Sequence, residues 1–270
     1  MNCVMTSRRK FLALSGASIS APFLSSISAA EENKDAKQQV VNKLLRENKK
    51  VKAKQFAAEN GIDLHHHRVN KESEGDSQDI SPTDWFTNPG DNGTRVDFFV
   101  TSPYGDECTF TLDWELMYDD TNVVDGASPK DAAVIAWEDS QWGLESLSSV
   151  SHAAYGTAGD GTRLDVSNSL AGGGLIGERQ NAIGLKIQDM DLGHPSGVEK
   201  MNGYLQLKTR KQNFPNRADG RVECLYKHTW SVLDNAHFNF LENVSINKGP
   251  LSVKLDTFSD SWDFRHDISL

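Results

Sequence analysis

The chain has 270 residues, of which 28 are Lys or Arg and 38 are Asp or Glu, so its net charge is −10 at neutral pH. An acidic surface repels the phosphates of nucleic acids, and the composition therefore argues against a nucleic-acid-binding protein. The sequence contains no apolar run long enough to span a bilayer, and no nucleophile elbow, phosphate loop, zinc-ligand spacing or dinucleotide fingerprint.

The N-terminus carries an export signal. Residues 7–12, Ser-Arg-Arg-Lys-Phe-Leu, match the twin-arginine signature, and a weakly apolar stretch follows them. The stretch ends in small residues of the kind that a signal peptidase accepts, so we expect cleavage after Ala30. Residues 1–30 are therefore predicted to be a signal peptide, with Arg8 and Arg9 recognised by the twin-arginine translocase. The alternative is an uncleaved N-terminal anchor.

Residues 31–62 are predicted to form one amphipathic helix. The segment 36–60 is rich in Lys, Gln, Glu and Ala, contains no Gly or Pro, and is followed by Gly61, a residue type that commonly ends helices. Its apolar residues fall on one helical face: Val41, Leu44, Leu45, Val51 and Phe56. A narrow apolar stripe of this kind needs a partner surface.

The next segment, residues 63–82, is polar and is predicted to be a linker or mobile loop. It contains the triplet His65-His66-His67, and imidazoles are ligands for transition metals. Three adjacent residues rarely converge on one tetrahedral ion. A solvated loop is therefore the favoured interpretation of the triplet, and a metal site is the alternative.

Residues 83–270 are predicted to form a mainly β domain. Apolar and polar residues alternate with period two in segments 96–100, 110–116, 183–187 and 222–232. Turn signals such as Asp160-Gly161 and Asn202-Gly203 separate the strands. One-sided alternation is typical of antiparallel sheets with one buried and one solvent-facing side. We therefore expect an antiparallel two-sheet sandwich or jelly roll, preceded by the N-terminal helix.

The alternation assigns individual side chains to the two faces of a sheet. Trp114 and Trp230 follow the apolar register and are predicted to be buried. Asp113 and Glu115 are predicted to face solvent, about 7 Å apart on one strand. Paired carboxylates at such a distance suit glycoside hydrolysis, with Glu138 as a further candidate acid. Outward-facing acids are also common on any acidic protein, and that is the favoured interpretation.

Removal of the signal leaves two cysteines, Cys108 and Cys224, and both follow the apolar register of their strands. We expect both to be buried. An exported protein favours a disulfide between them, whereas a protein that folds in a reducing cytoplasm before export does not need one. A disulfide and two buried thiols remain equal alternatives.

Two further kinds of site are candidates. Asp119, Asp120 and Asp125 lie in acidic turns and offer the hard oxygen ligands that calcium prefers. Solvated turns are the favoured alternative, and no cofactor other than calcium is considered.

Trp137 is out of register with its neighbours and Trp142 lies among turn residues, so either indole is a candidate platform for stacking a sugar ring. Packing in the core is the favoured interpretation of Trp137 and an equal alternative for Trp142.

The arrangement of a twin-arginine signal, a helix ending in Ala-Glu-Asn-Gly-Ile (58–62) and an acidic β region with tryptophans resembles uncharacterised secreted proteins of haloarchaea. The resemblance implies export of the folded chain to the medium or cell surface, with the translocase and a signal peptidase as partners. It implies no activity. We expect a non-enzymatic binding or structural module that contacts a surface glycan or another cell-envelope component. The alternative is a carbohydrate-active hydrolase or lectin on a jelly-roll scaffold that uses paired carboxylates.

Overall fold

A computed structural model describes residues 22–70, 90–103, 105–117, 130–137, 142–171, 182–188, 198–211, 221–230 and 260–269. The chain divides into two compact units, Met1–Ala36 and Lys37–Leu270, and the second unit holds both sheets and most of the helical residues. The α-helices are α1 (Pro22–Arg46) and α2 (Lys50–Asn60), and Leu147–Ser149 form a short 3-10 helix, η1. No described helix combines the length and apolar character needed to cross a membrane.

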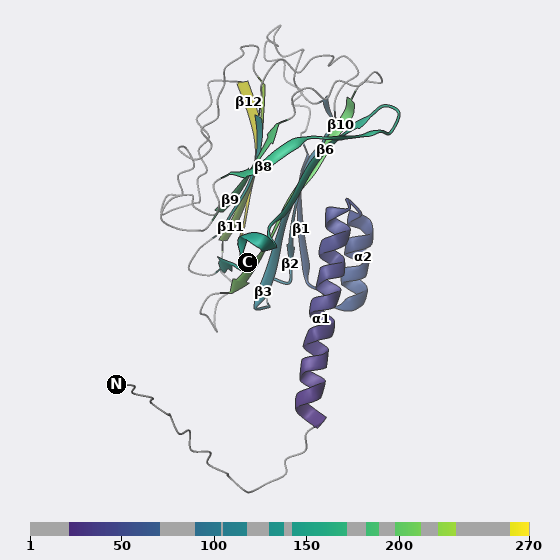
Figure 1. The fold of residues 1–270 in the computed structure, drawn as a ribbon, viewed down its shortest axis with the longest axis vertical. Helices are drawn as coiled ribbons and strands as arrows, with labels where there is room; N and C mark the ends of the chain where they lie inside the picture. Colours follow the sequence, from purple (N-terminus) through teal and green to yellow (C-terminus); the bar gives the residue numbers. More distant parts are fainter. Residues whose placement is uncertain are drawn as a thin grey trace, which may run out of the picture. The chain divides into compact units, whose positions relative to one another are not determined.

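Twelve strands are found within the described residues, and they form two sheets (Figure 1). Sheet A has the order β1-β2-β3-β10-β6-β7, with β5 paired to β10, and sheet B has the order β12-β11-β4-β9-β8. The strands of sheet A are β1 (Leu64–Asn70), β2 (Gly90–Thr101), β3 (Glu107–Met117), β5 (Trp142–Leu144), β6 (Ser151–Ala158), β7 (Arg163–Asp165) and β10 (Val198–Lys211). Those of sheet B are β4 (Lys130–Trp137), β8 (Ser167–Ala171), β9 (Ala182–Gln188), β11 (Arg221–Trp230) and β12 (Asp260–Ser269).

Every strand pair in the two sheets is antiparallel, which confirms the predicted mainly β, two-sheet fold. The core between the sheets contains the apolar register of β3, β9 and β11, as the alternation predicted. Trp114 is fully buried, and its ring lies 5.1 Å from the ring of Tyr226 in sheet B. The Tyr226 hydroxyl donates to Asp131 Oδ2 at 2.5 Å, which satisfies the polar end of this aromatic contact. Strand β11 contains Trp230, but the side chain of Trp230 lies outside the described part.

The predicted single helix is in fact a helical hairpin. The chain leaves α1 at Arg46, Asn48 adopts a positive φ of 54°, and α2 starts at Lys50. The break resets the helical phase, so Val51 is 80 % exposed rather than on the apolar face. The predicted end is confirmed, because Gly61 takes the left-handed conformation (φ 64°) that closes α2.

Residues 37–62 of the hairpin pack on the outer face of sheet A, the face opposite sheet B. A second apolar cluster joins residues 37–62 to β2, and its buried members are Val41, Leu45, Ala53, Ala57, Ile62 and Phe99. Two side-chain bonds add to it: Asn42 Nδ2 donates to Thr109 Oγ1 on β3, and Gln206 Nε2 on β10 donates to the carbonyl of Asn42. At strands β1 to β3, sheet A is therefore the middle of three layers and has apolar contacts on both of its faces.

Two local predictions are corrected. Residues 64–70 of the expected linker form β1, an edge strand paired with β2. Its polar composition suggested a loop because His66 and Arg68 face a buried charged cluster instead of an apolar core. Asn202-Gly203 was expected to form a turn but lies in the middle of β10. The turn at Asp160-Gly161 is present, with a φ of 83° at Gly161.

Candidate functional site

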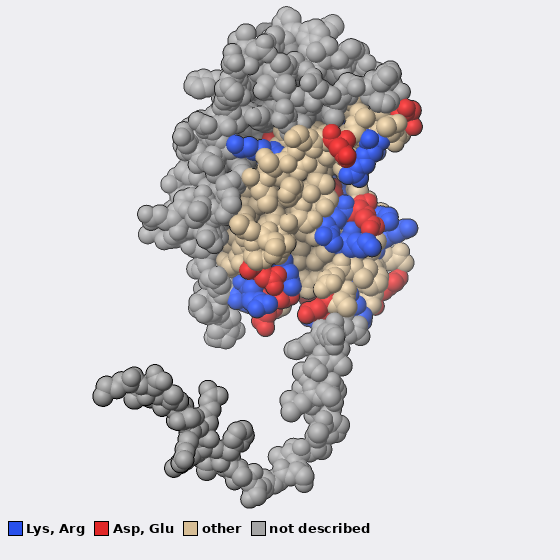
Figure 2. All heavy atoms as spheres, in the orientation of Figure 1, with Lys and Arg blue, Asp and Glu red and all other residues tan. Residues whose placement is uncertain are grey.

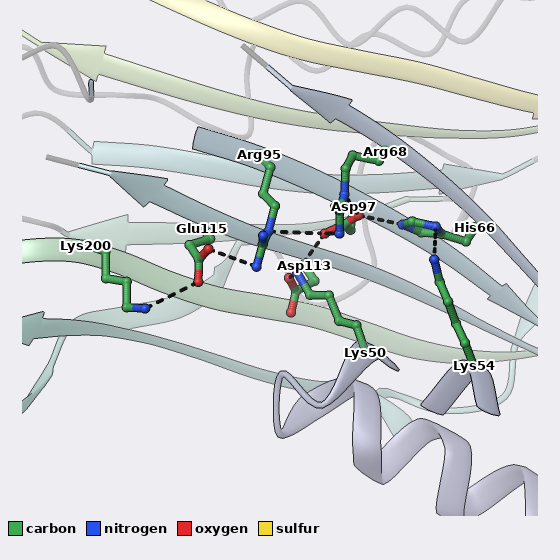
Figure 3. A network of polar contacts seen from close by, with 9 residues as sticks. All are labelled: Lys50, Lys54, His66, Arg68, Arg95, Asp97, Asp113, Glu115 and Lys200. Atoms are coloured by element: carbon green, nitrogen blue, oxygen red, sulfur yellow. Dashed lines mark hydrogen bonds and ion pairs between the residues drawn. The ribbon is translucent and has the colours of Figure 1, made fainter. Parts of the chain in front are cut away.

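A cluster of charged side chains lies on the outer face of sheet A, where α2 covers β2 and β3 (Figure 3). The strand register places Asp97 on β2 opposite Asp113 on β3, and Arg95 opposite Glu115. Asp113 and Glu115 are 4 % and 8 % exposed, so the prediction that they face solvent is wrong. They alternate with core residues as predicted, but the helical hairpin covers the face of the sheet that was expected to be exposed to solvent.

Lys50 connects the hairpin to the sheet. Its amine lies 2.7 Å from Asp97 Oδ2 and also contacts Asp113 Oδ1. The Lys50 side chain is 8 % exposed, so this is a buried ion pair between the first residue of α2 and two neighbouring strands. Buried charges persist in folded proteins when they are paired in this way.

Asp97 is the centre of the cluster and is fully buried. It accepts hydrogen bonds from His66 Nε2 at 2.5 Å and Arg68 Nε at 2.7 Å, in addition to its contact with Lys50. Burial by itself would raise the pKa of Asp97, but the bonds from His66 and Arg68 and the charge of Lys50 outweigh it and hold the pKa well below its usual range. The same bond to Asp97 raises the pKa of Arg68.

Asp113 has the opposite electrostatic environment. Burial raises its pKa from 3.8 to about 7, and the charge and hydrogen bond of Lys50 only partly oppose this shift. Two carboxylates on adjacent strands therefore differ in protonation over the acidic and neutral range. Asp97 is ionised, while Asp113 carries a proton below about pH 7.

We expect Asp113→Asn to remove a pH dependence of stability. The folded state binds the Asp113 proton more tightly than the unfolded state, so this residue makes the free energy of unfolding fall as pH rises from about 4 to about 7. Asp97 adds little slope above about pH 5, because its carboxyl is ionised there in the folded state and almost fully ionised in the unfolded state. Urea unfolding at pH 5, 6 and 7 measures the effect. The parent should lose stability relative to the variant as pH rises, and parallel pH profiles of the two proteins would show that Asp113 is not shifted.

His66 is the histidine of the triplet that faces this cluster. Its Nδ1 lies 2.7 Å from the amine of Lys54 on α2, and its ring stacks on Phe99 at 4.4 Å with an interplanar angle of 16°. His65 and His67 point to the other side of β1, because successive side chains of a strand alternate. Within the described residues, no three His, Cys, Asp or Glu side chains gather as a metal site requires.

The predicted tryptophan platforms are both buried. Trp137 is fully buried in the core with Ala133 and Ile135, so the inward register of β4 is the reverse of the one inferred from sequence. The apolar side chains on both faces of β4 made its periodicity ambiguous. Trp142 is 2 % exposed and packs edge-on against Phe110, with ring centroids 6.1 Å apart. Neither indole presents a face to a ligand, so both tryptophans are core residues and neither is a sugar platform.

Cys108 and Cys224 are buried, as predicted, and both are thiols in the structure rather than halves of a disulfide. Burial raises the pKa of the Cys108 thiol well above its usual value, so Cys108 behaves as a small apolar residue. The remaining candidates lie outside the described residues: Arg8, Arg9, Asp119, Asp120, Asp125 and Glu138.

A second surface was not predicted from the sequence. Beyond the hairpin, the outer face of sheet A continues onto β10 and β6, where Tyr204 pairs with Ala153 and Asn202 pairs with Tyr155. Both tyrosines are half-buried, the guanidinium of Arg163 lies 3.9 Å from the centre of the Tyr155 ring, and the Tyr204 hydroxyl is 3.1 Å from Ser151 Oγ. Residues 151–158 lack a clear apolar–polar alternation in sequence, so no local pattern pointed to this face.

No family model and no curated protein matches this sequence. Among solved structures, the chain is similar to ACE19, the collagen-binding subdomain of the Enterococcus faecalis surface protein ACE, at 8 % identity and a TM-score of 0.28, over 60 % of this chain and 86 % of that one. It is similar to the C-terminal domain of the Streptococcus pyogenes antigen I/II-family protein AspA at 9 % identity and a TM-score of 0.31, over 52 % and 50 % of the two chains. A collagen-binding domain from a Staphylococcus aureus adhesin matches at 11 % identity and a TM-score of 0.27, over 59 % and 88 %. At these values the likeness assigns no function to this chain.

Proposed function

We propose that the protein is an exported, non-enzymatic binding module that acts at the cell surface or in the medium. The twin-arginine signature at Arg8-Arg9 supports export. The core between the sheets is filled with side chains, which supports a scaffold that binds its ligand on the outer surface. The observation that carries the binding role is the tyrosine face. We define this face as Ser151, Ala153, Tyr155, Thr157 and Tyr204 on β6 and β10.

The composition of the tyrosine face suits an uncharged glycan of the cell envelope. None of its five side chains is charged, although the whole chain has a net charge of −10, and the guanidinium of Arg163 covers one side of the Tyr155 ring. On the face of the molecule that Figure 2 shows, uncharged surface lies between clusters of charged residues. Tyrosine offers a flat apolar ring together with a hydroxyl, the combination that a pyranose needs for stacking and hydrogen bonding. Serine and threonine hydroxyls add donors and acceptors beside the rings.

The alternative function, a hydrolase that uses paired carboxylates, has less support. Asp113 is buried against Lys50, and Glu115 is paired with Arg95 at 2.9 Å and Lys200 at 3.7 Å. A general acid or nucleophile must reach the substrate, and both carboxylates are instead directed into ion pairs beneath or beside the hairpin. This arrangement favours a structural role for Asp113 and Glu115.

The binding role predicts a specific loss on substitution of the tyrosines. Mature protein, residues 31–270, should sediment with isolated cell envelopes and with insoluble neutral polysaccharide. The double variant Tyr155→Ala, Tyr204→Ala should lower the retained fraction at least about tenfold, because each lost aromatic contact costs on the order of 1 kcal/mol. Val51→Ala, a change at an exposed site on α2, is the matched control and should bind as the parent does. Equal retention of the tyrosine variant would move the binding surface elsewhere, and no retention of the parent would end the proposal.

A further inference from the structure

Lys54, His66 and Asp97 form a linear chain of hydrogen bonds from the surface into the buried cluster (Figure 3). Lys54 is an exposed residue of α2, His66 lies on β1, and Asp97 is fully buried on β2. The Lys54 amine is 2.7 Å from His66 Nδ1, and His66 Nε2 is 2.5 Å from Asp97 Oδ1. A group exposed at the surface is thus connected through an imidazole to a buried carboxylate.

The donors in this chain are determined by chemistry. The ammonium group of a protonated lysine has no lone pair and can only donate, so Nδ1 of His66 is the acceptor when Lys54 is protonated. The proton of the neutral imidazole then lies on Nε2 and is donated to Asp97. The stacking of the ring on Phe99 and the short bond to Asp97 hold His66 with the lone pair of Nδ1 directed at Lys54.

The partner of Lys54 is unusual for a structural lysine. Lys50, one turn earlier on α2, contacts two carboxylates and has the ordinary role of a buried cation. Lys54 instead contacts a base that is itself oriented by an acid. A nucleophile within hydrogen-bond distance of a base, with the base held by a third group, is the arrangement that activates nucleophiles in covalent catalysis.

We propose that Lys54 is an acyl-accepting nucleophile that reacts with carboxylic esters, with His66 as general base and Asp97 as the residue that positions His66. The neutral amine attacks the ester carbonyl, and an N–C bond forms while a proton passes from Nζ to His66 Nδ1. The bond between the acyl carbon and the leaving oxygen then breaks, and the imidazolium returns the proton to that oxygen. The products are an amide on Lys54 and an alcohol, so the module becomes covalently attached to an ester-bearing partner.

The test compares two lysines of one helix in one peptide. Mature protein is treated with a limiting amount of p-nitrophenyl acetate and cleaved after Glu, which releases residues 48–59 with both Lys52 and Lys54. Lys52 is an exposed neighbour on α2 and serves as the internal reference. Tandem mass spectrometry should show acetylation of Lys54 at least about a hundredfold faster than Lys52, the lower end of what a general base contributes.

Substitution of the base is the second arm. His66→Gln keeps an amide donor toward Asp97 but removes the basic nitrogen, and it should bring the ratio of the Lys54 rate to the Lys52 rate close to one while the Lys52 rate stays unchanged. Lys54→Arg should lose the dominant acetyl adduct. Similar rates for Lys54 and Lys52 in the parent overturn the proposal without any variant, and a ratio unaffected by His66→Gln overturns the role of His66.

Discussion

Asp97→Asn should destabilise the protein by about 3–5 kcal/mol, the range observed when one partner of a buried ionic network is removed. Asp97 is fully buried and accepts bonds from Lys50, His66 and Arg68. The asparagine would keep the size of the side chain but not its charge, and Lys50 and Arg68 would lose their central counter-ion. The free energy of unfolding from urea titration at pH 7 measures the effect.

Asp165→Asn is the matched control, because Asp165 is also an aspartate on sheet A with a basic neighbour. Its side chain is 93 % exposed and lies 3.6 Å from Arg163, so its loss should change stability by less than about 1 kcal/mol. If Asp97→Asn were as mild as this control, the charged cluster would not hold the hairpin on the sheet. Recovery of stability by a second change, Arg68→Met, would support the loss of charge balance as the cause.

Gly203→Ala should destabilise the protein by about 3 kcal/mol or more, the upper end of the cost of overpacking a core. Gly203 lies on β10 directly opposite Trp114 of β3. A Cβ atom at Gly203 would meet Cε2 of the Trp114 ring at 2.5 Å and the carbonyl oxygen of Ala153 at 2.6 Å. The indole cannot move aside easily, because it is fully buried against Tyr226. Thermal or urea unfolding of the single variant measures the cost.

Two further variants identify the cause of that cost. Gly105→Ala adds the same methyl group at a site where the nearest atom would be 3.5 Å away, and it should change stability by less than about 0.5 kcal/mol. In a Trp114→Leu background, Gly203→Ala should cost at least about 1 kcal/mol less than in the parent, because the indole is gone. An equal cost in both backgrounds would point to the Ala153 carbonyl as the dominant clash.

The alternation of polar and apolar side chains along β3 explains which site residues were predicted correctly from the sequence and which were not. The inward residues of β3 were identified correctly, since a strand places alternate side chains on opposite faces and only one face of β3 is apolar. The residues between them, including Asp113 and Glu115, were assigned to solvent because they are polar. The burial of Asp113 depends on Lys50, which is 63 positions away in the sequence, and that of Glu115 depends on Arg95 and Lys200.

The sequence alone determined the antiparallel sandwich, the burial of Cys108 and Cys224, and the end of the helical region at Gly61. Each of these follows from local pattern: period-two alternation, or the backbone freedom of one glycine. Only the tertiary structure decided that β1 is a strand and that Asn202-Gly203 lies within β10. In both cases a distant partner overrides the local signal, because Arg68 of β1 bonds to Asp97 and the missing side chain of Gly203 makes room for the Trp114 indole.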